Sequence, residues 1–230
     1  MAITMEASAV PSGNPTTSYT ITIPAATLAD DILILSNTNR DSDTDPSVTD
    51  NEGAGAWAKV GENGRLSVWW KRATSSTASK TITAGTQTGS SSGVLKVYRG
   101  CRLGTPYENV TTEGNASGDE SHAAITPTRD GCMVILCISN ATNDLATTTH
   151  AATNPSSLSL VEKLSTGGSD CSNGQAHGIQ TGSAGSTGTL SWAQVNAISA
   201  SVVLDLIPAA TLTAAAGSFS MTGNAASLLA

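Results

Sequence analysis

The sequence has few charged and few aromatic residues, and both shortages restrict what the protein does. Only 13% of its 230 residues are charged and 3% are aromatic, and the net charge is −7. Nucleic-acid binding needs a basic face, which this acidic balance does not supply. No basic amphipathic stretch indicates a membrane surface, and no run reaches the roughly 18 apolar residues of a spanning helix. We therefore expect neither nucleic acid nor a membrane as a partner.

Cysteine is also scarce, and no CxxC pair is present among the four cysteines. Cys132 and Cys137 lie on one expected strand at an odd spacing, so their side chains point to opposite faces and cannot form a disulfide. The N-terminus lacks the basic and apolar segments of a secretory leader, which predicts synthesis in a cytoplasm. We expect all four cysteines to be buried free thiols.

Strand patterns dominate the sequence, and no segment shows sustained helical periodicity. "SYTITIP" alternates polar and apolar residues, as a half-buried strand does. "DILILS" and "CMVILCIS" are continuous apolar runs of strand length, which predict central strands covered on both faces. In "LSVWWKR", Leu66, Val68 and Trp70 share one face, and Trp69 lies on the other. The pattern predicts an all-β, antiparallel β-sandwich of the jelly-roll type.

An internal repeat divides the chain into two similar halves, residues 18–100 and 121–207. "TITIP" followed by "DILILSN" resembles "AAITP" followed by "MVILCISN", and "SSSGVLKVYRG" resembles "ISASVVLDLIP". Such halves either close one sandwich or stand as tandem domains. We expect one sandwich domain over residues 1–207, because no linker richer than the ordinary loops separates the halves. The uncharged, Ala- and Ser-rich residues 208–230 are expected to form an extended C-terminal arm.

Signatures of catalysis are missing. The sequence has no HExxH motif, Walker loop or dinucleotide-binding fingerprint, and its GxSxG match, "GSSSG", lies in a Gly- and Ser-rich stretch that no predicted helix follows. His122, His150 and His177 are predicted to lie in Gly-, Ala- and Thr-rich loops, with no carboxylate at a suggestive spacing. We expect no catalytic residue and no cofactor, and hence a protein that is not an enzyme.

The stretch "RDSDTDPSVTDNEG" has the carboxylate spacing of a calcium-binding loop. Asp41, Asp43, Asp45 and Glu52 match the acidic positions of an EF-hand. Pro46, however, stands where that loop needs the conformational freedom of glycine, and flanking helices are not predicted. Residues 47–60 instead predict a hairpin whose turn carries Glu52 at its tip. The weak metal candidate that remains is an oxygen-ligand site formed by Asp41, Asp43 and Asp45 alone.

Trp69 is the one aromatic residue whose strand neighbours indicate exposure. Three interpretations stay open: a partly covered core residue, an anchor for a protein interface, or a platform on which a carbohydrate stacks.

Several of these segments together resemble a β-sandwich module of tailed-bacteriophage virion proteins. The resemblance follows the order "TITIP", "DILIL", "PSVTDNEGAGAWAKV", "LSVWWKRA" and "VLKVYRGCRLGTPYENV", and the second half fits the same pattern. The ending "AAAGSFSMTGNAASLL" resembles an Ala-Gly-Ser-Phe segment near the C-termini of phage structural proteins. The matches are strand and turn patterns, and "GCRLG" departs from the small or acidic residues expected there.

The resemblance implies a virion structural protein, most like a capsid decoration (cement) protein. Such proteins commonly form trimers over junctions between major capsid subunits, so it implies a homotrimer on the capsid exterior with the major capsid protein as partner. The arm, and residues before Ser18, would brace neighbouring subunits, with Trp69 and the apolar arm residues as interface candidates. Those arm residues are Phe219, Met221, Leu228 and Leu229. The alternative is a tail-fibre or receptor-binding module that recognises a host surface glycan.

Overall fold

The structure is a computed structural model that describes nine segments of the chain. These are residues 2–12, 17–40, 46–53, 56–85, 89–115, 120–142, 150–165, 171–192 and 198–210. Their regular secondary structure consists of β-strands, and no helix within them is long and apolar enough to cross a membrane. The expected all-β, antiparallel class is therefore confirmed.

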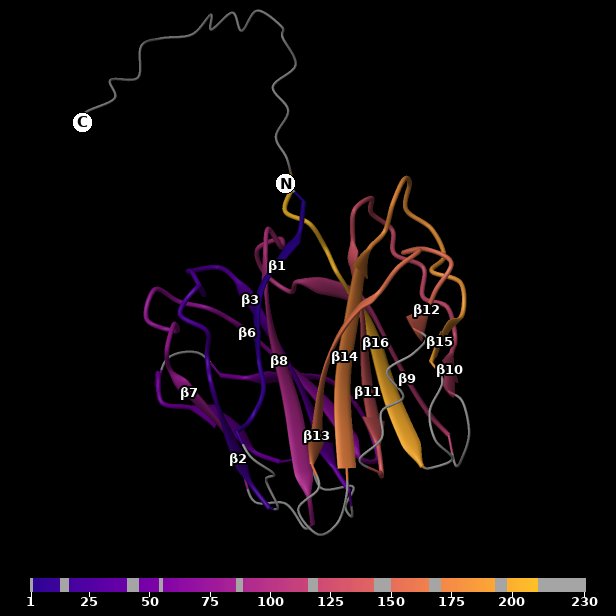
Figure 1. Cartoon of the computed structure of the whole chain (residues 1–230). Helices are drawn as coiled ribbons and strands as arrows, with labels where there is room; N and C mark the ends of the chain where they lie inside the picture. The colour runs from indigo at the N-terminus through magenta and orange to yellow at the C-terminus, as the bar shows by residue number, and fades with distance from the viewer. Residues whose placement is uncertain are drawn as a thin grey trace, which may run out of the picture.

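The first half of the chain forms eight strands arranged in two sheets (Figure 1). The strands are β1 (Thr4–Ala9), β2 (Tyr19–Thr22), β3 (Ile32–Asn39), β4 (Val48–Asp50), β5 (Ala58–Asn63), β6 (Leu66–Arg72), β7 (Thr81–Ala84) and β8 (Ser91–Arg99). A five-stranded sheet has the order β1-β8-β3-β6-β5, and a three-stranded sheet has the order β2-β7-β4. All of the pairings are antiparallel.

The second half forms another eight strands in two further sheets. These strands are β9 (Tyr107–Asn115), β10 (Glu120–His122), β11 (Met133–Asn140), β12 (His150–Ala151), β13 (Ser159–Ser165), β14 (Cys171–Ile179), β15 (Leu190–Trp192) and β16 (Ser199–Leu206). The five-stranded sheet reads β13-β14-β11-β16-β9, and the three-stranded sheet reads β10-β15-β12.

The two halves have the same topology. Adding eight to each strand number of the first half reproduces both strand orders of the second half. Each half thus has the strand connectivity of an eight-stranded jelly roll, in which Greek-key connections join two sheets. The duplicated unit runs from β1 to β8 and from β9 to β16, so each copy begins one strand earlier than the repeat of residues 18–100 and 121–207 seen in the sequence.

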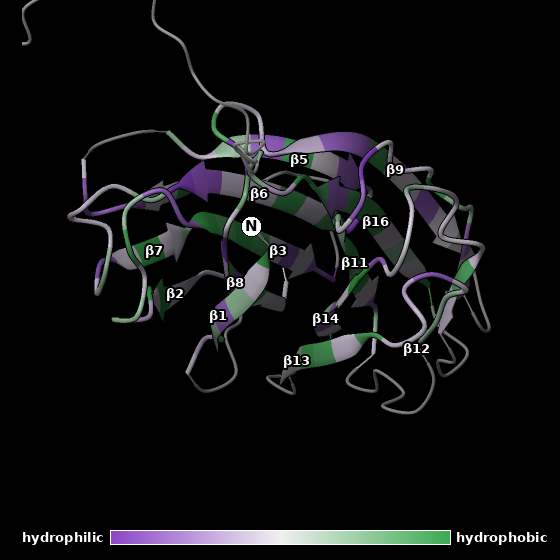
Figure 2. Cartoon of the chain, turned by 90° about the horizontal axis from the view of Figure 1, so that it is seen from above, coloured by the Kyte–Doolittle hydropathy of each residue, from purple (hydrophilic) through white to green (hydrophobic). Residues whose placement is uncertain are grey.

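The four sheets lie in layers, with the two five-stranded sheets face to face at the centre (Figure 2). Three clusters of buried apolar residues fill the gaps between the layers. The central cluster, which contains Ile34 and Leu204, takes residues from both halves. The outer clusters each belong to one half and lie under its three-stranded sheet. Each half therefore has its own core, and the halves share a third.

Strands β3 and β11 explain why the sequence contains two continuous apolar runs. Every residue of both strands is buried. In β3, Ile32 and Ile34 point into the central cluster, while Leu33 and Leu35 point into the outer cluster of the first half. A strand with apolar partners on both faces has no solvent face, so its polar alternation disappears. The prediction of central strands covered on two faces is confirmed for both runs.

The hairpin expected over residues 47–60 is wrong in its pairing. The chain does rise along β4, turn through Asn51 and Glu52, and return along β5. However, β4 pairs with β7 in the three-stranded sheet, whereas β5 pairs with β6 in the five-stranded sheet. The segment crosses from one sheet to the other, because each strand finds its hydrogen-bond partner in a different layer.

Candidate functional site

The contact between the halves contains a buried cluster of polar side chains. Ser36 Oγ donates to Asn173 Oδ1 at 2.6 Å, and Asn173 Nδ2 donates to Thr38 Oγ1 at 2.6 Å. All three residues are buried, so water does not compete for these bonds. Because Ser36 and Thr38 come from the first half and Asn173 from the second, the bonds fix how the central sheets are aligned.

A second polar contact between the halves pairs a lysine with a histidine. Lys96 of β8 is fully buried, and its Nζ lies 2.7 Å from Nδ1 of His177 on β14. Nζ also donates to the carbonyl oxygen of Ser159 at 3.1 Å. Burial lowers the pKa of Lys96 to about 7. Burial, together with the nearby Lys96 charge, lowers the pKa of His177 to about 4.

Strand β14 supplies most of this polarity from one face. Asn173, Gln175 and His177 alternate along the strand, so they point to the same side, toward the first half. The opposite face carries Gly174, Ala176 and Gly178, with Ala176 in the outer cluster. A segment with small residues on one face and polar residues on the other has the composition of a loop. The sequence therefore does not predict β14 as a strand.

The turn after β4 holds a buried ion-pair cluster. Lys71 Nζ lies 2.7 Å from Asp50 Oδ2 and 2.7 Å from Glu52 Oε2, and all three side chains are almost fully buried. Burial alone would raise the pKa of Glu52. Hydrogen bonds from Lys71 and from the hydroxyl groups of Thr74, Ser76 and Thr77 outweigh this effect and lower the pKa to about 2. Glu52 lies in the turn, as predicted, and its side chain is buried there. It ties the turn to β6 and to the loop that follows β6.

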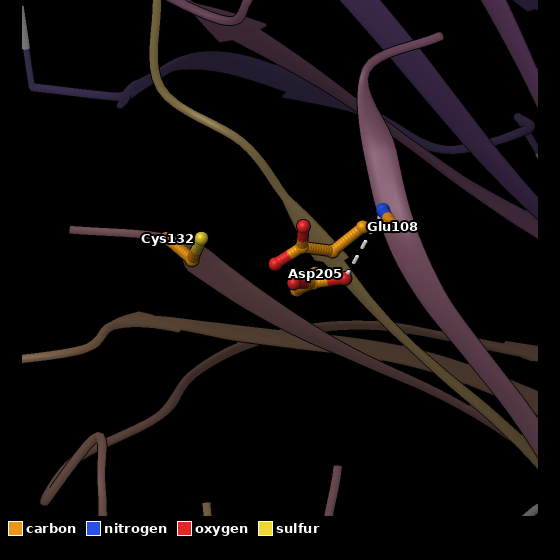
Figure 3. Close-up of side chains that lie close together, drawn as sticks. All are labelled: Glu108, Cys132 and Asp205. Carbon is orange, nitrogen blue, oxygen red and sulfur yellow. Dashed lines mark hydrogen bonds between the residues drawn. The ribbon is translucent and has the colours of Figure 1, made fainter. Parts of the chain in front are cut away.

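Glu108, Cys132 and Asp205 form a group of ligand atoms that lie within 4.8 Å of one another (Figure 3). Asp205 accepts hydrogen bonds from the backbone N–H groups of Glu108 and Asn109 and from the Asn109 side chain. Burial raises the pKa of the Asp205 carboxyl, and burial together with Asp205 raises the pKa of the Cys132 thiol to about 12.

These contacts give the Asp205 carboxylate a structural role. The pairing of β16 with β9 shifts register between Leu204 and Leu206. Such a bulge leaves backbone donors without ladder partners, and Asp205 accepts from two of them. The Asp205 carboxylate is thus already occupied by hydrogen bonds from the neighbouring strand. The group therefore fits closure of the bulge better than metal coordination.

The segment that leads to the C-terminal residues is clamped to the body of the protein. Ala209 N donates to Gly100 O at 2.7 Å, and Arg102 N donates to Ile207 O at 2.9 Å. Cys101 and Pro208 form an isolated β-bridge between these bonds. Gly100 has φ of +84°, and a Cβ there would meet the carbonyl oxygen of Ala2 at 2.6 Å. The start of the described chain and residues 208–210 therefore lie together at one end of the molecule (Figure 1).

Most of the site residues singled out in the sequence lie outside the described residues. This holds for the metal candidates and for the apolar arm residues. They are Asp41, Asp43, Asp45, Phe219, Met221, Leu228 and Leu229. Residues 4–9, expected to brace a neighbouring subunit, form the edge strand β1 and pair with β8.

Trp69 is half-buried and packs against the outer cluster of the first half. Its Nε1 donates to Ser67 Oγ at 3.1 Å, and Lys59 Nζ lies 6.0 Å from the ring centroid. These contacts favour the interpretation of a partly covered core residue over that of an open platform.

The prediction that the three histidines lie in loops is wrong. His122, His150 and His177 belong to strands β10, β12 and β14. The prediction for the cysteines is confirmed, since all four are buried free thiols. Strands β10 and β12 are short, and β14 has one β-branched residue, Ile179, and no Phe, Tyr or Trp, so intrinsic preference gives little strand signal.

The buried charge of Lys96 is not among the features predicted from the sequence. It lies in the run "VLKVY", where it is the one charged residue in an otherwise apolar, fully buried stretch of β8. Burying a charged side chain is unfavourable unless it is paired. A lysine inside an apolar run is therefore the sequence feature that could have pointed to this contact.

Comparison with known proteins assigns no family: no protein-family model matches the chain, and neither a curated protein nor a solved structure shows significant similarity to it.

Proposed function

We propose that the protein is a structural component of a phage virion, a decoration protein that binds the exterior of the capsid and contacts the major capsid protein. Jelly rolls are a recurrent architecture of viral capsid proteins. The resemblance of the strand and turn patterns to phage virion modules supports the same assignment. The role is one of binding and bracing, without a catalytic step.

One observation carries the proposal: the root of the C-terminal segment is clamped where both halves meet. Gly100 and Arg102 come from the end of the first half, and Ile207 and Ala209 from the end of the second. A segment attached to a neighbour through residues beyond 210 would therefore be anchored to both jelly rolls at once. Such a rigid root is what a bracing arm requires, because a loose root would not transmit restraint from one subunit to the next.

Symmetry supplies the affinity in this proposal. A decoration protein makes many weak contacts, and linking them in one oligomer raises the effective concentration of each. We propose a homotrimer, with one arm per subunit. Light scattering after size-exclusion chromatography measures the oligomer directly, and a mass of three chains is the expected result.

Attachment to purified capsids tests the function. Full-length protein and a variant truncated after Ala210 would be mixed with capsid shells that lack the protein, and bound material would be measured by sedimentation. We expect saturable binding of the full chain at a copy number that matches capsid symmetry, and loss of binding by the truncated variant. The truncation keeps the contacts of Ile207 and Ala209, so its circular dichroism spectrum and melting temperature should equal those of the full chain.

The proposal fails if the full chain does not bind the shells, or if the truncated variant decorates them normally. Cryo-electron microscopy of the intact particle adds an independent readout. If density for the protein appears in a few copies on the tail, and not as a symmetric set on the capsid, the tail-fibre role would replace the decoration role.

That alternative, a glycan-recognising tail-fibre module, is favoured by one feature. A pocket of about 280 Å³ is lined by Thr49, Ala56 and Trp57, and an aromatic ring in a pocket wall is a common element of sugar-binding sites. Trp57 is 8% exposed, and the buried Asp50 carboxylate already accepts from Trp57 Nε1 at 2.9 Å and from Lys71 Nζ at 2.7 Å, so Asp50 is not available as a sugar ligand. Binding of the protein to host cell-surface polysaccharide, abolished by Trp57→Ala in a folded variant, would support this alternative.

A further inference from the structure

A pocket of about 510 Å³ opens at the edge of the central sandwich where β1 lies near the β12–β13 loop and the end of β14. Its volume falls within the range of small-molecule sites. The apolar part of the wall includes Ile3, Met5, Met133 and Ile179, and the polar part includes Ser159 and His177. Ile179 is 37% exposed, so an apolar surface faces the opening. The proposed capsid contact does not use this pocket.

The polar end of the pocket is backed by the buried lysine. His177 lines the pocket, and its Nδ1 lies 2.7 Å from Lys96 Nζ behind the wall. A charged lysine has donors and no acceptor, so it donates to Nδ1 and places the imidazole proton on Nε2. The pocket is then offered an N–H donor whose polarity is increased by the positive charge behind it.

No anion within the described part of the chain balances this charge. The groups that face Lys96 are His177 of β14, the carbonyl of Ser159 of β13 and the Cys137 thiol of β11, and the ring of Tyr98 packs on that of His177. None of them is a carboxylate. A buried cation without a counter-ion is costly, and an anion that enters the pocket would relieve that cost.

We propose that this pocket binds a medium-chain aliphatic carboxylate. The carboxylate accepts the hydrogen bond from His177 Nε2, and the chain lies along the accessible parts of Met5 and Ile179, which border the buried Ile3 and Met133 in the pocket wall. A carboxylate carries one negative charge and so matches the single positive charge of the Lys96–His177 pair. A phosphate group carries more charge and would need further donors. The apolar wall selects a ligand with an aliphatic body.

Binding of the anion is coupled to the protonation of Lys96. Burial lowers the pKa of Lys96 to about 7, whereas the pKa of His177 is lowered to about 4 and that of Cys137 is raised to about 12. Burial also raises the pKa of Tyr98 well above its usual value. Between pH 6 and pH 8, Lys96 is therefore the group of this set that changes charge. The ligand binds the charged form, so its affinity falls about tenfold from pH 6 to pH 8.

Isothermal titration calorimetry with octanoate and the full chain tests the proposal. We expect saturable binding of one octanoate per chain, about tenfold tighter at pH 6 than at pH 8. Proton uptake at pH 8 should make the measured heat depend on the ionisation enthalpy of the buffer. Octanol has the same apolar body without the charge, and it should bind more weakly and without pH dependence.

Two variants assign the effect to the lysine and the histidine. Lys96→Met should lower the affinity for octanoate at pH 6 about tenfold or more and remove the pH dependence. His177→Phe should also lose affinity, which keeps the test valid if Lys96→Met does not fold. Lys59→Met removes a lysine on the opposite edge, in β5, and should bind octanoate as the unmodified chain does.

Three results would overturn the proposal. The first is the absence of saturable heat with octanoate. The second is octanoate binding by a folded Lys96→Met or His177→Phe variant with unchanged affinity and pH dependence. The third is equal affinity for octanol and octanoate, which would make the pocket an apolar cavity without an anion site. Capsid attachment is measured separately, so neither outcome depends on the other.

Discussion

The two edges of the central sandwich are equivalent by duplication, yet they have diverged. At one edge β5 of the first half lies over β9 of the second, and at the other β1 lies toward β13 (Figure 2). Since β9 corresponds to β1 and β13 to β5, the edges are two copies of the same arrangement. At the β5–β9 edge, Gly61 lets the sheets approach closely, because a Cβ there would meet Val110 at 3.1 Å and Val202 at 3.3 Å. The other edge is open and forms the 510 Å³ pocket.

The chemistry beneath the two edges differs in the same way. Toward β5 and β9, the halves meet through apolar side chains such as Val68, Leu204 and Val110. Toward β1 and β13, they meet through Lys96, His177 and Asn173. Duplication of a jelly roll supplies two equivalent seams. One of them is apolar, whereas the other carries polar groups and a cavity, and its buried lysine lowers stability as the pH falls toward 7.

The largest expected effect comes from weakening the apolar seam. Leu204→Ala removes a fully buried side chain of the central cluster. We expect the free energy of unfolding to fall by about 2–5 kcal/mol, as measured by urea denaturation. Leu103→Ala is the matched control, because Leu103 is 75% exposed and its loss should change little. Equal effects of the two substitutions would show that the apolar seam is not what holds the halves.

The next effect is a pH dependence that belongs to the polar seam. The folded chain keeps Lys96 neutral down to about pH 7, whereas the unfolded chain protonates it below its ordinary pKa near 10.5. Stability due to this group is therefore lost as pH falls toward 7. We expect the unfolding free energy of the native chain, relative to Lys96→Met, to drop by about 2–3 kcal/mol between pH 9 and pH 7. Parallel pH profiles from denaturant unfolding would contradict the buried, neutral lysine.

A smaller effect is expected from the neutral hydrogen bonds of the polar seam. Asn173→Ala removes the hydrogen-bond partner that Ser36 and Thr38 share, and it leaves Ser36 Oγ with the longer bond to the Val94 carbonyl oxygen at 3.3 Å. We expect a loss of about 1–3 kcal/mol in the free energy of unfolding. Combining it with Ser36→Ala in a double-mutant cycle should give a coupling energy of at least about 0.5 kcal/mol. Strict additivity would mean that the two residues act independently.

The smallest effect is expected for a charge on the closed edge. Lys59 of β5 forms an ion pair with Glu62 and lies beside Trp69 in a partly exposed position. Lys59→Met should change the free energy of unfolding by less than about 1 kcal/mol and should not alter its pH profile between pH 7 and pH 9. A larger change in the free energy of unfolding, measured under the same conditions as for Lys96, would mean that a lysine contributes equally to stability at the two edges.

The sequence predicted those parts of the fold in which residue type and environment agree. The apolar runs at Ile32–Leu35 and Met133–Ile138 predicted two doubly covered strands, and the repeat predicted two similar halves. The face assignment in β6 was also correct, with Val68 in the central cluster and Trp69 in the outer one. In these segments the apolar pattern alone determines which face is buried.

The parts that were not predicted depend on partners distant in sequence. β14 has no apolar pattern, because its inward side chains are satisfied by Ser36, Thr38 and Lys96 of the other half. The separation of β4 from β5 likewise depends on β7 and β6, which compete for them as partners. The pocket beside His177 was out of reach for the same reason, since β1, β13 and β14 meet there only after the halves pack.

The place of β16 in its sheet determines how the protein would respond to a pull on its C-terminal segment. Residues 207–210 continue directly from β16, which is hydrogen-bonded to β11 on one side and to β9 on the other. Force along this strand would have to shear two ladders at the same time, because neither can be unzipped one bond after another from that end. Antiparallel ladders that are loaded in shear share the force among all their bonds. The duplicated jelly roll is thus built to resist tension on the very segment proposed to grip the capsid.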